Sequence, residues 1–361
     1  MHVRRGAAAR DVITTRALPA RRFAAVAKRS RSILPGQRKR ILPEMKKSAL
    51  PPPFLNVLLS IAAAGVVYAA LPRPQRIRRG QVAVITGGSS GLGLAIAHEL
   101  GKAGLKLVLA ARDAEQLEAA RRALLAARSV ASSDDILTVV CDVSDKHQAT
   151  ALIDTAYANF QAVDLLVNDA GVIEVGPVEN ETTEAFETAM SINFFGALYT
   201  IYAVMPRFLA QGKGAIANIS SIGGKIPVPH LLPYVASKFA LTGLSEGLHS
   251  ELRHKGIRVT TVCPGLMRTG GETHAHFSGE VAKEKFWFQT AARTPLISAN
   301  VTRAAKKIVD AVNAGRAEIT ITPQAWLAAR FAGIAPESTQ WIASLINAYV
   351  LPRGIIADPA S

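Results

Sequence analysis

The chain has 361 residues, of which 49% are hydrophobic and 6% aromatic, and its formal net charge is +15. This length suits one large α/β domain with extensions, and the composition is that of a globular protein with an aliphatic core. Residues 1–80 hold 18 Lys and Arg against two acidic residues, whereas residues 81–361 hold 24 against 25. The folded part is therefore nearly neutral, which argues against nucleic acid as a partner.

Residues 1–50 form a basic leader that we expect to be disordered. They are rich in Arg, Ala and Ser, poor in acidic residues, and lack a sustained apolar period. Three interpretations stay open. The leader is an organelle transit peptide, a basic arm near anionic lipid, or an upstream extension of a chain whose translation starts at Met45.

Residues 54–71 are predicted to form a membrane anchor. They carry no charge, and as a helix rising about 1.5 Å per residue they would span about 27 Å, close to the hydrocarbon thickness of a bilayer. A buried or interfacial helix is the alternative. With a start at Met45, the four arginines in 72–79 favour a membrane-associated protein whose folded body faces the cytoplasm. A cytoplasmic or organellar protein, after removal of the leader, is the other possibility.

From residue 81 onward, apolar runs of strand length alternate with segments of helix length. The strands are expected at 82–86, 106–111, 136–141, 164–168, 215–219, 258–263 and 318–321. The helices are expected at 92–103, 114–127, 146–160, 183–209, 234–254 and 299–313. This alternation predicts an α/β fold: a Rossmann-type doubly wound parallel sheet in a single domain over 81–322, with its ligand at the carboxyl ends of the strands.

The two cysteines carry no chemistry that we can assign. Cys141 and Cys263 each close an apolar strand, and neither a disulfide framework nor a metal-ligand spacing can be built from them. We therefore expect buried thiols, a reducing compartment and no metal site.

A glycine-rich turn joins the first predicted strand to the first helix of the domain. Its candidate cofactor-binding residues are Thr86, Gly87, Ser89, Ser90, Gly91, Leu92 and Gly93. Glycine allows a tight turn and lets a pyrophosphate approach the free N–H groups of the helix N-terminus. The TGxxxGxG spacing differs from the more common GxGxxG fingerprint, which narrows the family.

The tip of the second strand indicates which nucleotide is bound. Ala111 stands where a carboxylate would bind the ribose 2′-hydroxyl of NAD, and Arg112 follows it. A guanidinium suits a 2′-phosphate through charge-assisted hydrogen bonds. Asp113 could serve NAD, but we expect it to cap the next helix. The cofactor is therefore predicted to be NADP(H).

Tyr234 and Lys238 are the candidate catalytic pair, because four residues along a helix place two side chains on one face. A free tyrosine titrates near pH ~10, and a nearby ammonium together with an oxidised nicotinamide would lower its pKa. Ser221 ends a strand and could hold the substrate oxygen. Ser220 is the alternative, but neighbouring residues in a strand point to opposite faces.

Taken in order, these motifs resemble the short-chain dehydrogenase/reductase family over about residues 81–320. The resemblance implies that Asn193 completes a proton relay with Ser221, Tyr234 and Lys238. It implies further cofactor contacts at Asp142, Val143, Asn168, Ala170, Gly171, Pro264, Gly265 and Thr269, in addition to Tyr234 and Lys238. Asp169 replaces the second asparagine of the family's NNAG motif, which puts the hydrogen bonding there in doubt.

The activity implied by the resemblance is reduction of a carbonyl by NADPH, or the reverse oxidation of an alcohol. NADPH would deliver hydride to the carbonyl carbon while Tyr234 protonates the oxygen. Ser221 would hold that oxygen, Lys238 would bind the ribose, and Asn193 would hold a water molecule. The alternative is a non-catalytic NADPH-binding scaffold or sensor.

Substrate specificity is expected in residues 270–296, which contain Phe286, Trp287 and Phe288. This segment is either a mobile lid over an apolar substrate or a helix that packs its aromatic side chains into the core. We expect a small lipophilic substrate, such as a 3-ketoacyl compound, a ketosphinganine, a steroid or a retinoid.

Residues 323–361 form an apolar C-terminal extension with partly helical spacing. Three roles stay open for it: a subunit interface, a cover for the substrate cavity, or a second membrane contact. We expect the protein to be a homo-oligomer.

Overall fold

The computed structural model describes residues 52–70, 76–268, 270, 275–294 and 298–354. The chain divides into two units, Met1–Ala63 and Ala64–Ser361. Helix α1 (Pro52–Ala70) is formed over the predicted apolar segment. Its apolar side chains Val57, Ile61 and Val66 are exposed. That α1 spans a membrane stays a prediction.

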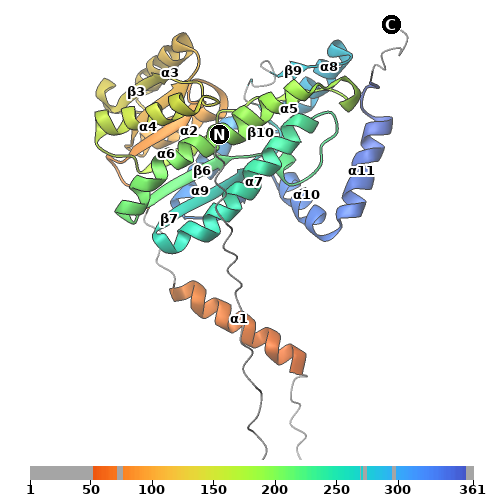
Figure 1. Cartoon of the computed structure of the whole chain (residues 1–361), viewed down its shortest axis with the longest axis horizontal. Helices are drawn as coiled ribbons and strands as arrows, with labels where there is room; N and C mark the ends of the chain where they lie inside the picture. Colours follow the sequence, from red (N-terminus) through yellow and green to blue (C-terminus); the bar gives the residue numbers. More distant parts are fainter. Residues whose placement is uncertain (1–51, 71–75, 269, 271–274, 295–297, 355–361) are drawn as a thin grey trace, which may run out of the picture. The chain divides into compact units, whose positions relative to one another are not determined.

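The second unit is built on a seven-stranded parallel sheet with the order β11-β7-β6-β4-β1-β2-β3 (Figure 1). The strands are β1 (Val82–Thr86), β2 (Lys106–Ala111), β3 (Ile136–Val140), β4 (Leu165–Asn168), β6 (Gly214–Ile219), β7 (Ile257–Cys263) and β11 (Glu318–Thr320). The chain direction across the sheet reverses between β1 and β4, where doubly wound sheets bind their ligands. The predicted Rossmann-type fold is confirmed.

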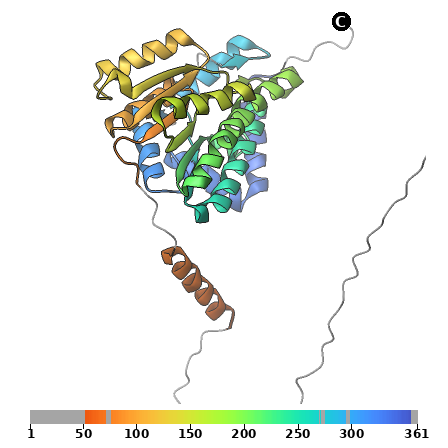
Figure 2. The same ribbon diagram turned by 60° about the vertical axis from the view of Figure 1, so that its left-hand side comes forward.

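Helices cover both faces of this sheet, as Figures 1 and 2 show from two directions. One layer holds α2 (Gly91–Lys102), α3 (Ala114–Ala126) and α9 (Val301–Asn313), and the other holds α4 (Lys146–Phe160), α6 (Gly196–Gln211) and α7 (Leu232–Leu252). Strand β1 supplies both cores by alternation: Ala83 and Ile85 pack in the first core, and Val82 and Val84 in the second.

The helix expected at 183–209 is interrupted. Helix α5 (Thr183–Met190) runs through a π-helical turn, Ser191–Phe195, into α6. The segment Thr183–Gln211 is long and apolar enough to cross a membrane by length and composition, with a mean hydropathy of 1.3. Here α6 packs against α4, and α5 packs against α7, as core helices do.

Two short strand pairs were not predicted from the apolar pattern: β5 (Glu174–Val175) with β9 (His276–Phe277), and β8 (Met267–Arg268) with β10 (Ala299–Asn300). Helix α8 (Val281–Arg293) lies in 270–296, where a packed helix was one of the two interpretations. Helices α10 (Pro323–Ile334) and α11 (Pro336–Tyr349) lie in the extension expected to have partly helical spacing. Helix α9 begins later than expected because Asn300 caps it, accepting a hydrogen bond from the Arg303 N–H at 3.1 Å.

Candidate active site

The glycine-rich turn is held tightly against the loop after β4. The Thr86 hydroxyl accepts hydrogen bonds from the N–H groups of Asp169 and Ala170, both at 3.2 Å. Gly87 has φ +70°, and a β-carbon on Gly93 would overlap the carbonyl of Gly87. Glycine is therefore required at both positions by backbone geometry and close approach.

The first turn of α2 presents backbone N–H groups without a side-chain cap. Ser90 is the N-cap residue and is exposed, but its side chain makes no capping hydrogen bond. Leu92 anchors the turn because it is buried in the core, and Ser89 is half-buried. A helix N-terminus of this kind attracts anions.

Arg112 lies at the same end of the sheet as this turn, since Thr86 pairs with Ala110 in register and Arg112 follows β2. The Arg112 side chain is exposed. Asp113 caps α3 as predicted: its carboxylate accepts from the N–H groups of Glu115 at 2.9 Å and Gln116 at 3.0 Å. At the tip of β2, the guanidinium of Arg112 is therefore exposed, whereas the carboxylate of Asp113 is already hydrogen-bonded to the start of α3.

Ser221, Tyr234 and Lys238 are brought together by β6 and α7. Ser221 follows β6 and is hydrogen-bonded to the Tyr234 hydroxyl, while its Oγ also accepts from the Gly223 N–H at 3.0 Å. The Lys238 ammonium lies 5.6 Å from the centroid of the Tyr234 ring and donates to the Ile219 carbonyl at 2.9 Å. The structure therefore brings together the three side chains that the spacing argument selected.

Ser220 is excluded as the residue that faces the substrate. Its hydroxyl is buried and bonded to the Lys238 carbonyl at 3.0 Å and the Thr242 hydroxyl at 2.7 Å. Of the two adjacent serines, Ser221 alone contacts Tyr234 within the described residues, in accord with strand alternation.

Burial dominates the protonation of the pair. It raises the pKa of Tyr234 to about 12, which the hydrogen bond from Ser221 partly opposes. Burial lowers the pKa of Lys238 to about 8, against the opposing influence of Asp169. Burial therefore favours a neutral phenol at Tyr234 at pH 7, which can donate a proton; the lowered pKa expected beside an oxidised nicotinamide stays a prediction.

Asn193 sits in the π-helical turn and is almost fully buried. Its amide nitrogen donates to the Val172 carbonyl at 3.0 Å and to Ser237 Oγ at 2.9 Å, and its oxygen accepts from the Val172 N–H at 2.9 Å. A β-carbon on Gly171 would lie 2.8 Å from the Asn193 oxygen and 3.6 Å from Lys238 Nζ. Gly171 thus lies between Asn193 and Lys238.

Asn168 does not face the open site. Its side chain is buried and bonded to Asn218 Oδ1 at 2.9 Å and to the Thr200 hydroxyl at 2.7 Å. Asn218 continues this polar layer to Ser245, which accepts from Thr261 at 2.8 Å. Sequence reasoning missed the layer because its members lie on strands and helices far apart in the chain.

The remaining predicted cofactor residues lie around the same edge of the sheet. Asp142 is half-buried. Its carboxylate accepts hydrogen bonds from the Ser144 N–H at 2.9 Å and from the Ser144 hydroxyl at 2.7 Å. Val143 is buried against Gly196. The Pro264 carbonyl accepts from the Ile222 N–H at 2.7 Å, next to Ser221. Gly265 follows it, half-buried, and Thr269 lies outside the described residues.

A buried hydrogen bond between a histidine and a glutamate links α8 to the rest of the domain. His230, with φ +61°, has its Nδ1 2.9 Å from Oε1 of Glu284, and Trp287 Nε1 donates to Oε2 at 2.6 Å. Phe288 is buried, whereas Phe286 is 73% exposed. The aromatic side chains of 287 and 288 therefore belong to the core, which favours the packed helix over the lid.

Comparison with known proteins identifies the family. The family model for short chain dehydrogenases matches residues 81–276. An uncharacterized oxidoreductase of Staphylococcus saprophyticus is 38% identical over 190 residues, covering 52% of this chain and 79% of that protein. A dehydrogenase/reductase SDR family protein 7-like protein of Anopheles gambiae is 30% identical over 295 residues, covering 80% and 88%.

Solved structures agree. A short chain dehydrogenase/reductase from Burkholderia phymatum in complex with NAD gives a TM-score of 0.66 at 28% identity, covering 72% of this chain and 95% of that one. A variant of actinorhodin polyketide ketoreductase with NADPH gives 0.58 at 30% identity, covering 67% and 95%. With its sheet order, its glycine-rich turn and its Ser–Tyr–Lys arrangement, this chain belongs to the short-chain dehydrogenase/reductase family of oxidoreductases.

Proposed function

We propose that this chain is an NADP(H)-dependent oxidoreductase that reduces a carbonyl to an alcohol, or catalyses the reverse reaction. The observation that carries the proposal is the hydrogen bond between Ser221 and the Tyr234 hydroxyl, with the Lys238 ammonium 5.6 Å from the ring. A neutral phenol next to a second hydroxyl is suited to bind and protonate a carbonyl oxygen.

The residues at the sheet edge fit a dinucleotide. Gly87 and Gly93 allow the tightly packed turn that leads into α2, and the uncapped start of α2 suits a pyrophosphate. When bound, the nicotinamide supplies or accepts the hydride. Arg112 is exposed and Asp113 is committed to capping α3, which favours the 2′-phosphate of NADP(H) over the free ribose of NAD.

The chain's own residues would move the proton. In the reducing direction the Tyr234 hydroxyl donates its proton to the carbonyl oxygen, which Ser221 also binds. The phenolate so formed is stabilised by the Lys238 ammonium. It regains its proton from solvent through the water molecule that Asn193 would hold. Oxidation of an alcohol runs through the same groups in reverse.

A lipophilic substrate is supported by the apolar side chains around Tyr234. Tyr234 packs against a small core that includes Val235, Leu231 and Phe288, and Trp287 packs against the same core. We further propose that α1 anchors the protein in a membrane with the catalytic domain facing the cytoplasm. Support comes from the uncharged 19-residue helix and the arginines that follow it.

The first experiment measures NADPH and NADH oxidation by the full chain against a panel of lipophilic ketones. We expect turnover with NADPH that falls by at least about 100-fold in Tyr234→Phe, because general acid catalysis contributes roughly 10²- to 10⁴-fold. Tyr202→Phe is the matched control, since Tyr202 is 62% exposed on α6.

The outcomes separate the alternatives. Equal turnover in Tyr234→Phe would contradict the mechanism, and a preference for NADH would contradict the assignment of Arg112. NADPH binding without turnover of any ketone in the panel, together with an intact cellular function in Tyr234→Phe, would favour the non-catalytic scaffold.

A further inference from the structure

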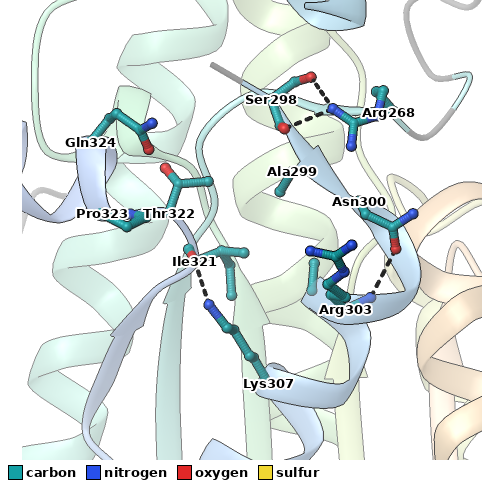
Figure 3. Close-up of a pocket in the computed structure, with 11 residues that line it drawn as sticks. Arg268, Ser298, Ala299, Asn300, Arg303, Lys307, Ile321, Thr322, Pro323 and Gln324 are labelled. Carbon is teal, nitrogen blue, oxygen red and sulfur yellow. Dashed lines mark hydrogen bonds between the residues drawn. The ribbon is translucent and has the colours of Figure 1, made fainter. Parts of the chain in front are cut away.

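A pocket outside the predicted active site opens between the first turn of α9 and the end of β11 (Figure 3). Its volume is about 240 Å³. The strand β8 with the start of β10 forms one wall, and Thr322 at the start of α10 belongs to the other. The pocket thus lies where two helices begin.

The charges around this pocket have one sign. Arg268, Arg303 and Lys307 line it, and none of the lining residues is acidic. In Figure 3 Arg268 lies above the pocket and Lys307 below it. Arg268 uses one guanidinium nitrogen on Ser298, at 2.8 Å to the carbonyl and 2.7 Å to the hydroxyl. Lys307 donates to the Ile321 carbonyl at 3.2 Å.

The Arg303 side chain, unlike those of Arg268 and Lys307, is not used in a hydrogen bond to the rest of the described chain. Its backbone N–H is capped by Asn300, but its side chain is exposed, and within the described residues no hydrogen bond or ion pair of its guanidinium occurs. Five N–H donors on Arg303, together with the unused donors of Arg268 and Lys307, are therefore available to a ligand.

This arrangement is electrostatically unfavourable without a counter-ion. Arg303 is the third residue of α9, in the turn where the helix dipole disfavours cations. Arg303 and Lys307 are four residues apart on one helix, a spacing at which like charges repel. Arg268 adds a third positive charge from β8. An anion bound among the three cations would relieve these repulsions.

We propose that this pocket is a binding site for a phosphate group. A phosphate has several oxygens and close to two negative charges, which match cations that converge from different directions, whereas a carboxylate has two oxygens in one plane and a single charge. The pocket has the volume of about eight water molecules at about 30 Å³ each. That leaves room beside the phosphate for the group that carries it.

The pocket is distinct from the places that would hold the phosphates of the cofactor. None of its lining residues belongs to the glycine-rich turn or to the tip of β2. Strands β11 and β1 are four positions apart in the sheet, about 19 Å at about 4.8 Å per strand. The pocket nevertheless borders the predicted cofactor site, because Arg268 precedes Thr269 and Thr322 packs against Gly265; saturating NADP⁺ in the test therefore separates the two sites.

The test is calorimetric titration of the full chain in detergent with inorganic phosphate, in the presence of saturating NADP⁺. We expect one site whose affinity falls at least about tenfold in Arg303→Ala and in Lys307→Ala. Lys306→Ala is the matched control, because Lys306 carries the same charge on the same helix and does not line the pocket. Acetate at the same ionic strength should not compete.

A second measurement covers a lipid source of the phosphate. Vesicles of phosphatidylcholine with phosphatidic acid should retain the wild type and Lys306→Ala more strongly than Arg303→Ala if the ligand is a lipid headgroup. The site is overturned if the pocket variants and the control behave alike in both measurements. It is also overturned if NADP⁺ abolishes phosphate binding in the wild type, since the phosphate then occupies the cofactor site.

Thermal unfolding separates a binding site from a structural role. Without phosphate, Arg303→Ala should unfold at the same temperature as the wild type or higher, because a repulsion is removed. Phosphate should raise the midpoint of the wild type and of Lys306→Ala but not that of Arg303→Ala. A lower midpoint of Arg303→Ala in the absence of phosphate would mean that Arg303 stabilises the fold by itself.

Discussion

At the scale of single residues, Asp169 is the position where this chain departs from the motif it resembles. Its backbone N–H is bonded to Thr86, and its carboxylate accepts from the Gly93 N–H in the first turn of α2. Burial raises the pKa of Asp169 to about 7, against the opposing effects of Lys238 and the Gly93 N–H. A titratable group thus takes the place of a neutral amide beside the catalytic lysine.

We predict that Asp169→Asn stabilises the protein at alkaline pH. The folded-state pKa is about 7 and the ordinary value is 3.8. The wild type therefore loses stability as the pH rises from about 4 to about 7, since only the folded state retains the proton in that interval. An asparagine side chain does not titrate, so the variant does not lose stability in this pH interval. Urea unfolding should show the variant more stable by about 2–4 kcal/mol at pH 8 and nearly equal below pH 4.

The control for this prediction is Asp134→Asn, an exposed aspartate on the surface, for which the difference from the wild type should not depend on pH. A second readout is catalytic. The Asp169 carboxylate raises the pKa of Tyr234 and of Lys238, so the pH profile of alcohol oxidation should move to lower pH in Asp169→Asn. An unchanged profile together with unchanged stability would contradict a buried charge at this position.

Sequence reasoning selected Ser221, Tyr234 and Lys238, which lie together in the structure, because each of its steps is local. Four residues along a helix align Tyr234 with Lys238, and the period of two in a strand separates Ser220 from Ser221. It did not give the raised pKa of Tyr234, because desolvation depends on what packs around the ring; the lowering expected beside an oxidised nicotinamide stays a prediction. Spacing alone carries no such information.

At the scale of elements, α8 is fixed by a hydrogen-bonded group that lies inside the core. Glu284 is fully buried, His230 is 6% exposed, and Trp287 donates to the same carboxylate. His230 and Glu284 are 54 residues apart in the chain, so no local sequence pattern predicts that they pair. The apolar cluster beneath it includes Leu231 and Val235 and contacts Tyr234. The position of α8 and the surroundings of the catalytic tyrosine are thus coupled.

We predict that Glu284→Ala destabilises the protein by roughly 3 kcal/mol, because it leaves the buried His230 and the Trp287 N–H without their acceptor. Urea unfolding measures the loss. Glu280→Ala is the control: Glu280 precedes α8 and makes an exposed ion pair with Lys283 at 2.6 Å, which is worth little. Equal effects of the two substitutions would mean that the buried pair contributes no more than a surface one.

Trp287→Ala is predicted to change substrate preference and to leave NADPH affinity unchanged. Trp287 packs against the apolar cluster that Tyr234 contacts, whereas none of the residues of the glycine-rich turn belongs to that cluster. The ratio of kcat/KM between a bulky and a small ketone should shift by about tenfold or more, the size expected when one aromatic contact is lost. Phe286→Ala, at an exposed position of α8, should leave the ratio as it is.

The long strands and helices could be predicted from the apolar pattern because burial on both faces of the sheet imposes it. The predicted strand 258–263 and the observed Ile257–Cys263 differ by one residue. The pairing of β5 with β9 could not be predicted, because each strand has only two residues and the two strands are about a hundred residues apart in the sequence. The π-helical turn at Asn193 is likewise set by contacts with Val172.

At the scale of the whole molecule, the C-terminal hairpin of α10 and α11 leaves an apolar face uncovered. Helix α11 has no buried residue among those described, and Trp341, Ile334 and Tyr349 are exposed. From 323 to 349 the sequence carries two charges, Arg330 and Glu337. Helix α11 forms with α10 the hairpin drawn in Figure 1. The apolar composition predicted this extension, but not what covers it.

We predict that this face joins two copies of the chain. Aromatic and aliphatic side chains with few charges are typical of homodimer interfaces, and an exposed apolar patch of this kind is uncommon on a monomer. Light scattering after size exclusion in detergent should give a dimer or larger assembly for the wild type. The combined variant Ile334→Ser, Trp341→Ser, Tyr349→Ser should have the mass of a single chain and a lower turnover of ketones, because it loses the restraint that the interface would place on the segment at Gly265, which α10 contacts.

The same variant distinguishes the other two roles of the hairpin. If the face instead contacts a membrane, the mass of the wild type will equal that of the variant in detergent, and only retention on phosphatidylcholine vesicles will fall. If the hairpin covers the substrate cavity, the masses will again agree, but the KM for lipophilic ketones will rise. Since Thr322 and Ala325 already pack against Gly265, which follows β7, an interface on α10 would also restrain the segment at Gly265. A dimer that forms through the hairpin should therefore lose activity on dilution at the concentration at which its mass falls.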